Sequence, residues 1–286
     1  MQVTRNIADT RSAVAEARRS GRRIGFVPTM GALHRGHASL IDAARRDGTY
    51  TVVSIFVNPL QFGPNEDYQK YPRDEVADLQ VCQQAGVDLV FIPSTDELCR
   101  PDAVTRVHVA KLTETLCGVS RAGHFDGVTT ICTKLFNIVQ PDVAYFGEKD
   151  FQQLAVVRRM VRDLDMPLEI VGCPTVREEN GLAISSRNMY LTPAERDQAA
   201  CLYDGLIKAR NRIHAGERNA SKITALLRDV ITAAGPARID YIRLVDSETM
   251  QPVERISGPV LVALAVHIGA ARLIDSFFVD PGRRGA

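Results

Sequence analysis

With 286 residues, 35 Lys and Arg against 34 Asp and Glu, and 45% hydrophobic residues, the chain can bury a substantial core and carries almost no net charge. This balance argues against disorder and against a nucleic-acid-binding protein, whose surface usually has a strong basic excess. The six cysteines lack CxxC spacing, and neither a secretory leader nor an apolar run long enough to cross a membrane is visible. We therefore expect reduced thiols, a cytoplasmic location, and neither a nucleic-acid nor a membrane partner.

Short apolar runs alternate with amphipathic stretches over the first two thirds of the chain. The stretch 151–165, for example, repeats apolar residues at helical spacing. Five runs have the length and composition of strands buried on both faces: 23–28, 51–57, 88–93, 142–147 and 168–173. This alternation predicts an α/β fold with a doubly wound parallel, Rossmann-like sheet.

The pattern changes near residue 186. Thr192 as N-cap, Pro193 at the first helical position and Glu195 predict a capping box, and one amphipathic helix is expected from there to Ile213. A second helix and three strands are expected over 221–234, 238–246, 259–269 and 271–280. We therefore expect a Rossmann-like domain over 1–176 and a smaller α+β domain over 177–286.

The stretch GFVPTMGALHRGHASLI (25–41) places His34 and His37 between a predicted strand and a predicted helix. Ligands bind at such strand ends in open α/β sheets, Gly31 and Gly36 permit close approach, and a helix N-terminus favours anions. A metal site would need a third ligand or an HExxH frame, which is not found nearby, and a purely structural role stays open. The pattern favours a phosphate site, although neither GxGxxG nor a Walker A string occurs.

A lysine occupies the corresponding position after a later strand, in YFGEKDFQQL (145–154). Lys149 stands among Gly147, Glu148 and Asp150 where a helix should begin, so it is well placed to reach a phosphate. The alternative is an ordinary solvated lysine in a loop.

Two further loops carry candidate side chains. Ser185, Ser186 and Arg187 offer two hydroxyls and a guanidinium for a phosphate, and the segment suits a mobile phosphate clamp and a plain interdomain turn equally well. The long loop over 57–74 contains Gln61, which is able to hydrogen-bond a small polar substrate or simply to shape the loop.

Taken together, these segments resemble the pantothenate synthetase (pantoate–β-alanine ligase) family, within the nucleotidyltransferases that share a His-x-Gly-His turn. The resemblance covers essentially the whole chain in order, through PTMGALHRGH, VNPLQFGPNEDYQKYPR, GHFDGV, YFGEKDFQQL, PTVRE and LAISSRNMYL. It implies ATP-dependent condensation of pantoate with β-alanine through a pantoyl adenylate, in a homodimer, with Mg²⁺ on the phosphates. The first domain would bind nucleotide and pantoate, and the second would act as a lid.

The resemblance also implies roles for individual residues. Gln61 and Gln153 would hold pantoate, Gln61 would lie near β-alanine, and Asp78 is the candidate Mg²⁺ ligand. His37 would be the catalytic acid. The other catalytic groups would be His34, Lys149, Ser185, Ser186 and Arg187. The ATP site would comprise Met30, Gly31, Ala32, Leu33, His34, Arg35, Gly36, His37, Gly147, Glu148, Lys149, Asp150, Val176, Ile184, Ser185, Ser186 and Arg187.

Two positions depart from the family pattern. Cys117 stands where many relatives have glutamate, and Ile184 replaces a common methionine. Two other functions stay open: a nucleotidyltransferase acting on a phosphorylated substrate, and a nucleotide-binding regulatory module. The first would leave Gln61 and Gln153 without a role, and the joint presence of the histidines, Lys149 and Arg187 argues against the second.

Overall fold

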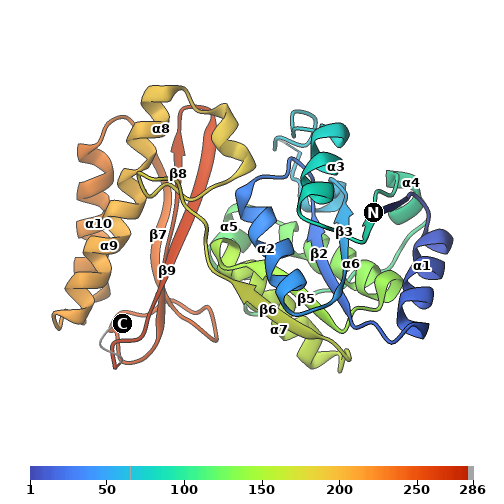
Figure 1. The fold of residues 1–286 in the computed structure, drawn as a ribbon. Helices are drawn as coiled ribbons and strands as arrows, with labels where there is room; N and C mark the ends of the chain where they lie inside the picture. Colours follow the sequence, from blue (N-terminus) through green and yellow to red (C-terminus); the bar gives the residue numbers. More distant parts are fainter. Residues whose placement is uncertain (65, 283–286) are drawn as a thin grey trace. The chain divides into compact units, whose positions relative to one another are not determined.

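The structure is a computed structural model that describes residues 1–64 and 66–282, and the chain forms two compact units (Figure 1). The first unit comprises Met1–Val109, Arg121–Glu148 and Gln153–Pro174. The second comprises Ala110–Ser120, Lys149–Gln152 and Thr175–Ala286. Two short segments that precede residue 175 thus belong to the second unit, and the division between residues 176 and 177 stays a prediction.

The first unit is built on a six-stranded parallel sheet in the order β1-β4-β3-β2-β5-β6. This is the doubly wound α/β sheet that the sequence predicts. Its strands are β1 (Gln2–Thr4), β2 (Ile24–Thr29), β3 (Tyr50–Ile55), β4 (Leu89–Phe91), β5 (Val143–Gly147) and β6 (Glu169–Cys173). The chain leaves β2 toward β3 on one side and continues from β5 to β6 on the other, so β2 and β5 meet at a topological switch point, where such sheets bind ligands.

Helices cover both faces of this sheet because successive side chains of a strand point to opposite sides. Val27 of β2 packs with Leu40 and Ile41 of α2, whereas its neighbour Phe26 meets Phe136 of α6 edge-on, with ring centroids 6.3 Å apart. The helices are α1 (Ile7–Arg19), α2 (Arg35–Arg46), α3 (Glu75–Gln84), α4 (Thr95–Leu98), α6 (His124–Val139) and α7 (Phe151–Asp163), with the 3₁₀ turns η1 (Pro59–Gln61) and η2 (Glu148–Asp150).

The second unit contains a three-stranded antiparallel sheet with two long helices packed on it, which is the α+β arrangement that the sequence predicts (Figure 1). The elements are α5 (Cys117–Ser120), η3 (Ser186–Tyr190), α8 (Pro193–Ala199), α9 (Cys201–His214), α10 (Ala220–Ala233), β7 (Arg238–Asp246), β8 (Val260–Ile268) and β9 (Ala271–Val279). The predicted capping box of Thr192 and Glu195 is present. The prediction of one continuous helix as far as Ile213 is wrong, because the helix is interrupted at Ala200, between α8 and α9.

Along residues 1–64 and 66–282, no helix combines the length and the apolar composition that crossing a bilayer requires.

Candidate active site

The strand ends at the switch point carry the first group of predicted site residues. Residues 30–34 leave the carboxyl end of β2 and enter α2, while Gly147 ends the neighbouring strand β5. Glu148 and Lys149 follow directly in η2. The structure therefore brings the Met30–His37 segment and the end of β5 to one edge of the same sheet, as the parallel arrangement requires.

Asp78 holds the turn between β2 and α2. Gly31 and Ala32 have φ values of 80° and 50°, and Asp78 from α3 accepts the next N–H groups: Oδ2 accepts from Ala32 N at 3.0 Å and Oδ1 from Leu33 N at 2.6 Å. A Cβ on Gly31 would lie 2.8 Å from Asp78 Oδ2, so this position needs glycine for both its dihedral angle and its space. Burial raises the pKa of Asp78 more than the two N–H donors lower it, so the ionised carboxylate costs free energy while it orders the turn.

The two histidines form a reciprocal cap at the start of α2. His34 is the N-cap, and its Nδ1 accepts from Gly36 N at 3.1 Å, while His37 Nδ1 accepts from the His34 N–H at 3.3 Å. The imidazole rings pack with centroids 4.1 Å apart. A neutral imidazole that accepts at Nδ1 carries its proton on Nε2, so each ring presents an Nε2–H donor.

This arrangement suits an anion. The first turn of α2 contains no acidic residue and includes the exposed Arg35, and backbone N–H groups at a helix N-terminus favour negative charge. The sequence left open whether the histidines are structural or functional. The geometry allows both, because capping occupies Nδ1 and chemistry would use Nε2.

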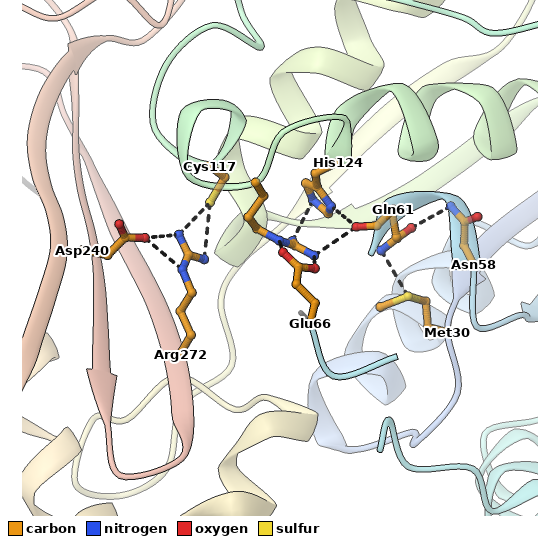
Figure 2. A network of polar contacts seen from close by, with 9 residues as sticks. Met30, Asn58, Gln61, Glu66, Cys117, His124, Asp240 and Arg272 are labelled. Atoms are coloured by element: carbon orange, nitrogen blue, oxygen red, sulfur yellow. Dashed lines mark hydrogen bonds and ion pairs between the residues drawn. The ribbon is translucent and has the colours of Figure 1, made fainter. Parts of the chain in front are cut away.

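Gln61 is oriented by a chain of hydrogen bonds that starts at the backbone (Figure 2). Asn58 Oδ1 accepts from Leu60 N at 3.1 Å and its Nδ2 donates to Gly127 O at 3.1 Å, so its amide cannot be flipped. Asn58 Nδ2 also donates to Gln61 Oε1 at 2.9 Å, which leaves Gln61 Nε2 to donate to Met30 Sδ at 3.1 Å. Sequence reasoning missed Asn58, although an Asn before Pro59 is a recognisable helix cap.

The remaining first-unit candidate, Gln153, is half-buried in α7. Its neighbour in the second unit, Gln152, is buried and structural: its Oε1 accepts from Cys117 N, and its Nε2 donates to the Leu112 and Thr115 carbonyls at 2.9 and 2.8 Å. Lys149, also in the second unit, has a side chain only 17% exposed, with Nζ 3.9 Å from an Asp150 carboxylate oxygen. It is therefore not the freely solvated lysine of the alternative interpretation.

The segment from Val176 to Arg187 is tied into the second unit. Ile184 N donates to Val176 O at 3.0 Å, which places these two predicted ATP contacts side by side. Arg177 makes a two-pronged ion pair with buried Asp275, at 2.6 and 2.9 Å. Ser185 caps η3 by accepting from Arg187 N at 3.3 Å, and Ser186 is buried. These contacts fix the local structure of the segment, and its role as a phosphate clamp stays a prediction.

Cys117, at a position where many relatives have glutamate, contacts Arg272, which already pairs with the Asp240 carboxylate. Arg272 Nη2 lies 2.7 Å from Asp240 Oδ2 and 3.8 Å from Cys117 Sγ (Figure 2). The thiol also lies 3.2 Å from the Tyr241 hydroxyl. Asp240 therefore supplies the negative partner for Arg272.

Over residues 1–64 and 66–282, no group of three or more His, Cys, Asp or Glu side chains is arranged to hold a metal ion. Both oxygens of Asp78, the predicted Mg²⁺ ligand, accept backbone N–H groups. These hydrogen bonds give Asp78 a turn-forming role, and its metal-ligating role stays a prediction.

Comparisons with known proteins agree with the sequence resemblance. The family model for pantoate-beta-alanine ligase matches residues 2–278. The chain is 52% identical to a pantothenate synthetase of Acetivibrio thermocellus over 280 residues, covering 98% of this chain and all of that protein. A crystal structure of pantothenate synthetase from Thermus thermophilus superposes with a TM-score of 0.91 at 46% identity, covering 97% of this chain and 99% of that one.

A third comparison concerns a liganded relative. The structure of pantoate-beta-alanine ligase from Francisella tularensis, complexed with beta-gamma ATP and beta-alanine, has a TM-score of 0.80 at 35% identity and covers 97% of each chain. Matches of this extent and identity show common descent along the whole chain. The chain therefore belongs to the pantoate–β-alanine ligase family.

Proposed function

We propose that this protein condenses pantoate with β-alanine, using ATP and releasing AMP and pyrophosphate. The observation that carries the proposal is the pair of neutral imidazoles at the α2 N-terminus, at the switch point of the sheet. Family membership supports it, and so does the relative crystallised with beta-gamma ATP and beta-alanine.

The chemistry requires activation of a carboxylate. An amine does not displace oxide from a carboxylate, so the pantoate carboxylate first attacks the α-phosphorus of ATP, and pyrophosphate leaves. The amine of β-alanine then attacks the acyl carbon of the pantoyl adenylate, and AMP leaves with the bridging oxygen. Negative charge grows on the phosphoryl oxygens in the first step, where aligned donors lower the barrier.

The donors proposed for the phosphates come from several segments. His34 and His37 would donate hydrogen bonds from Nε2. In this neutral form His37 suits the role of a hydrogen-bond donor better than the role of the catalytic acid that the resemblance implies. Lys149, Ser185, Ser186 and Arg187 would add their charge and hydroxyl groups. The main chain of Met30–His37, with Gly147, Glu148, Asp150, Val176 and Ile184, would line the rest of the ATP site.

Pantoate is proposed to bind through Gln61 and Gln153. The orientation of Gln61 leaves one Nε2 hydrogen and one Oε1 lone pair for a substrate, enough to accept from and donate to the same hydroxyl. Mg²⁺ is proposed to arrive on the phosphate oxygens of ATP, because it binds few protein carboxylates and keeps several waters. A homodimer stays a prediction from the resemblance, and a cytoplasmic location stays a prediction from the sequence.

Product analysis tests this function. Purified protein is incubated with ATP, Mg²⁺ and pantoate, with and without β-alanine, and pyrophosphate, AMP and pantothenate are quantified. The proposal predicts equal amounts of all three only when both acids are present. Failure to turn over pantoate, together with nucleotide transfer to a phosphorylated acceptor, would favour the nucleotidyltransferase alternative.

A further inference from the structure

The main-chain carbonyl of Gln61 accepts hydrogen bonds from two side chains that lie about 60 residues later in the chain (Figure 2). His124 Nδ1 lies 2.9 Å from Gln61 O, and Arg121 Nη2 donates to the same oxygen at 3.1 Å. His124 is the first residue of α6, Arg121 lies in the turn before it, and both belong to the same unit as Gln61. A carbonyl has two lone pairs, so these two donors occupy its full capacity.

The tautomer of His124 follows from its second neighbour. Arg121 Nη1 lies 3.0 Å from His124 Nε2, and a guanidinium nitrogen is only ever a donor. Nε2 must therefore accept, which puts the imidazole proton on Nδ1, where it points at Gln61 O. Arg121 thus orients the imidazole as well as contacting the carbonyl itself.

Glu66 completes the cluster from the loop that follows Gln61. Arg121 Nε and Nη2 donate to the two Glu66 carboxylate oxygens at 2.7 and 2.6 Å, and the two side chains are only 14% and 24% exposed. Burial alone would raise the pKa of Glu66, but the hydrogen bonds and charge of Arg121 outweigh it and hold the pKa below its usual value. A two-pronged, mostly buried pair of this kind is stronger and better oriented than a surface ion pair.

The backbone beneath the cluster has little freedom to adjust. A Cβ on Gly127 of α6 would lie 2.2 Å from Leu60 O, so η1 sits directly against the helix. Gly127 O also accepts from Asn58, which orients the Gln61 side chain. The Gln61 residue is therefore held at its carbonyl by Arg121 and His124, and at its amide by Asn58.

We propose that Arg121, His124 and Glu66 form a latch whose function is to position Gln61 for the acid substrate, and that these residues act on that substrate only through Gln61. This inference rests on the proposed function, in which Gln61 binds pantoate. The latch also joins the Glu66 loop to the same carbonyl. Loss of the Arg121–Glu66 ion pair is therefore expected to loosen both the Gln61 side-chain amide and the loop that contains Glu66.

A double-mutant cycle tests the positioning role. His124→Leu removes the donor to the Gln61 carbonyl, and His124→Asn keeps an N–H near the Nδ1 position. We expect His124→Leu to lower kcat/KM for pantoate about tenfold, the usual cost of one buried hydrogen bond, with KM for ATP unchanged. His124→Asn should recover most of the loss.

In a Gln61→Ala background, which retains the carbonyl but lacks the amide, His124→Leu should have almost no further effect. A full tenfold loss in that background would overturn the inference.

A matched control uses the other histidine of this region. The His108 side chain is 59% exposed. It pairs with Asp126 of α6, outside the latch. His108→Leu should change kcat/KM by less than about twofold, as surface substitutions do. An equal loss in this variant would remove the specificity claimed for His124.

Hydrogen exchange tests the latch without reference to turnover. Glu66→Gln and His124→Leu should raise amide exchange in peptides covering residues 59–63 and 66–73, with little change in β2 or β5. Unchanged exchange there would overturn the latch even if activity fell. Absence of pantothenate formation by the wild-type protein would reject the proposed function, and the exchange result would still decide whether the latch exists.

Discussion

Asp78 and Leu33 are joined by a 2.6 Å hydrogen bond in which a buried carboxylate accepts the main-chain N–H of the turn that leads to His34. The other Asp78 oxygen accepts from Ala32, so one side chain of α3 orders the turn ahead of α2. The position of the two histidines thus depends on a residue more than 40 positions later in the chain.

Asp78→Asn should therefore impair ATP use without changing the dependence on Mg²⁺. The amide retains only one acceptor oxygen, so one turn N–H loses its partner and faces another N–H. We expect kcat/KM for ATP to fall about tenfold, the equivalent of one hydrogen bond. Steady-state kinetics over a range of Mg²⁺ concentrations provides the measurement. A large rise in the Mg²⁺ concentration for half-maximal rate would instead indicate that Asp78 ligates the metal.

Substitutions of His34 should separate its capping role from its chemical role. Asparagine is a good N-cap and places an oxygen near the Nδ1 position, but it has no group at the Nε2 position. His34→Asn should keep the thermal stability of the wild type and lose at least about a hundredfold in adenylate formation, as when a transition-state donor is removed. His34→Ala should lose activity and about 1 kcal/mol of stability as well. Near-normal adenylate formation by His34→Asn would show that capping is the residue's whole contribution.

The acid sensitivity of the first unit should depend in part on Asp142. Its Oδ2 accepts from Ile24 N at 2.6 Å and its Oδ1 pairs with Arg18 at 3.0 Å. Burial would raise the pKa of Asp142, but these partners outweigh it and lower the pKa. Because the folded-state pKa is lowered, the stabilisation is present above the unfolded-state value of about 4 and disappears as pH falls through the folded-state value.

Asp142→Asn should accordingly be less stable than the wild type at neutral pH and approach it in acid. Urea unfolding at a series of pH values from 7 downward measures the difference in free energy. Two curves separated by the same amount at every pH would contradict the assignment.

Ser54 offers a stability test that does not involve the site. Its Oγ is buried and, among the described residues, has no hydrogen-bond partner. Ser54→Ala removes an unpaired buried hydroxyl, so we expect no loss of stability and a gain of up to about 1 kcal/mol in urea unfolding. Ser39→Ala is the control, because Ser39 Oγ donates to Gly36 O at 2.7 Å, and its removal should destabilise. Marked destabilisation by Ser54→Ala would reveal a partner such as a buried water.

The central strands of the sheet follow from the sequence because they are short, apolar and bounded by turn residues. Helix α6 does not. Most of its residues are buried, which leaves only a narrow polar face around Thr133, Lys134 and Asn137, and its N-cap is Gly123 with no side-chain hydrogen bond. The break at Ala200 is also hidden, since the apolar spacing continues across it. Local patterns thus predict elements that have clear start and stop signals, and elements that lack such signals need the tertiary structure.

The same distinction applies to the candidate site. His34 and His37 stand out in the sequence because a strand-to-helix turn is where an anion site belongs. Their mutual cap was not expected, since histidine is outside the usual set of capping residues. Arg121 was missed and His124 was given no role, because their partner, the Gln61 carbonyl, lies about 60 residues earlier and carries no side-chain signal. The turn-forming hydrogen bonds of Asp78 were not predicted, because a sequence does not show which N–H groups a carboxylate will meet.

The most direct test of the account follows an oxygen atom. Pantoate labelled with ¹⁸O in its carboxylate is converted with ATP and β-alanine, and the AMP, pyrophosphate and pantothenate are analysed by mass spectrometry. Attack of the carboxylate on the α-phosphorus predicts one labelled oxygen in AMP, one retained in the new amide carbonyl, and none in pyrophosphate. Unlabelled AMP, with the label in inorganic phosphate or in water, would contradict the adenylate route and the role proposed for the paired histidines.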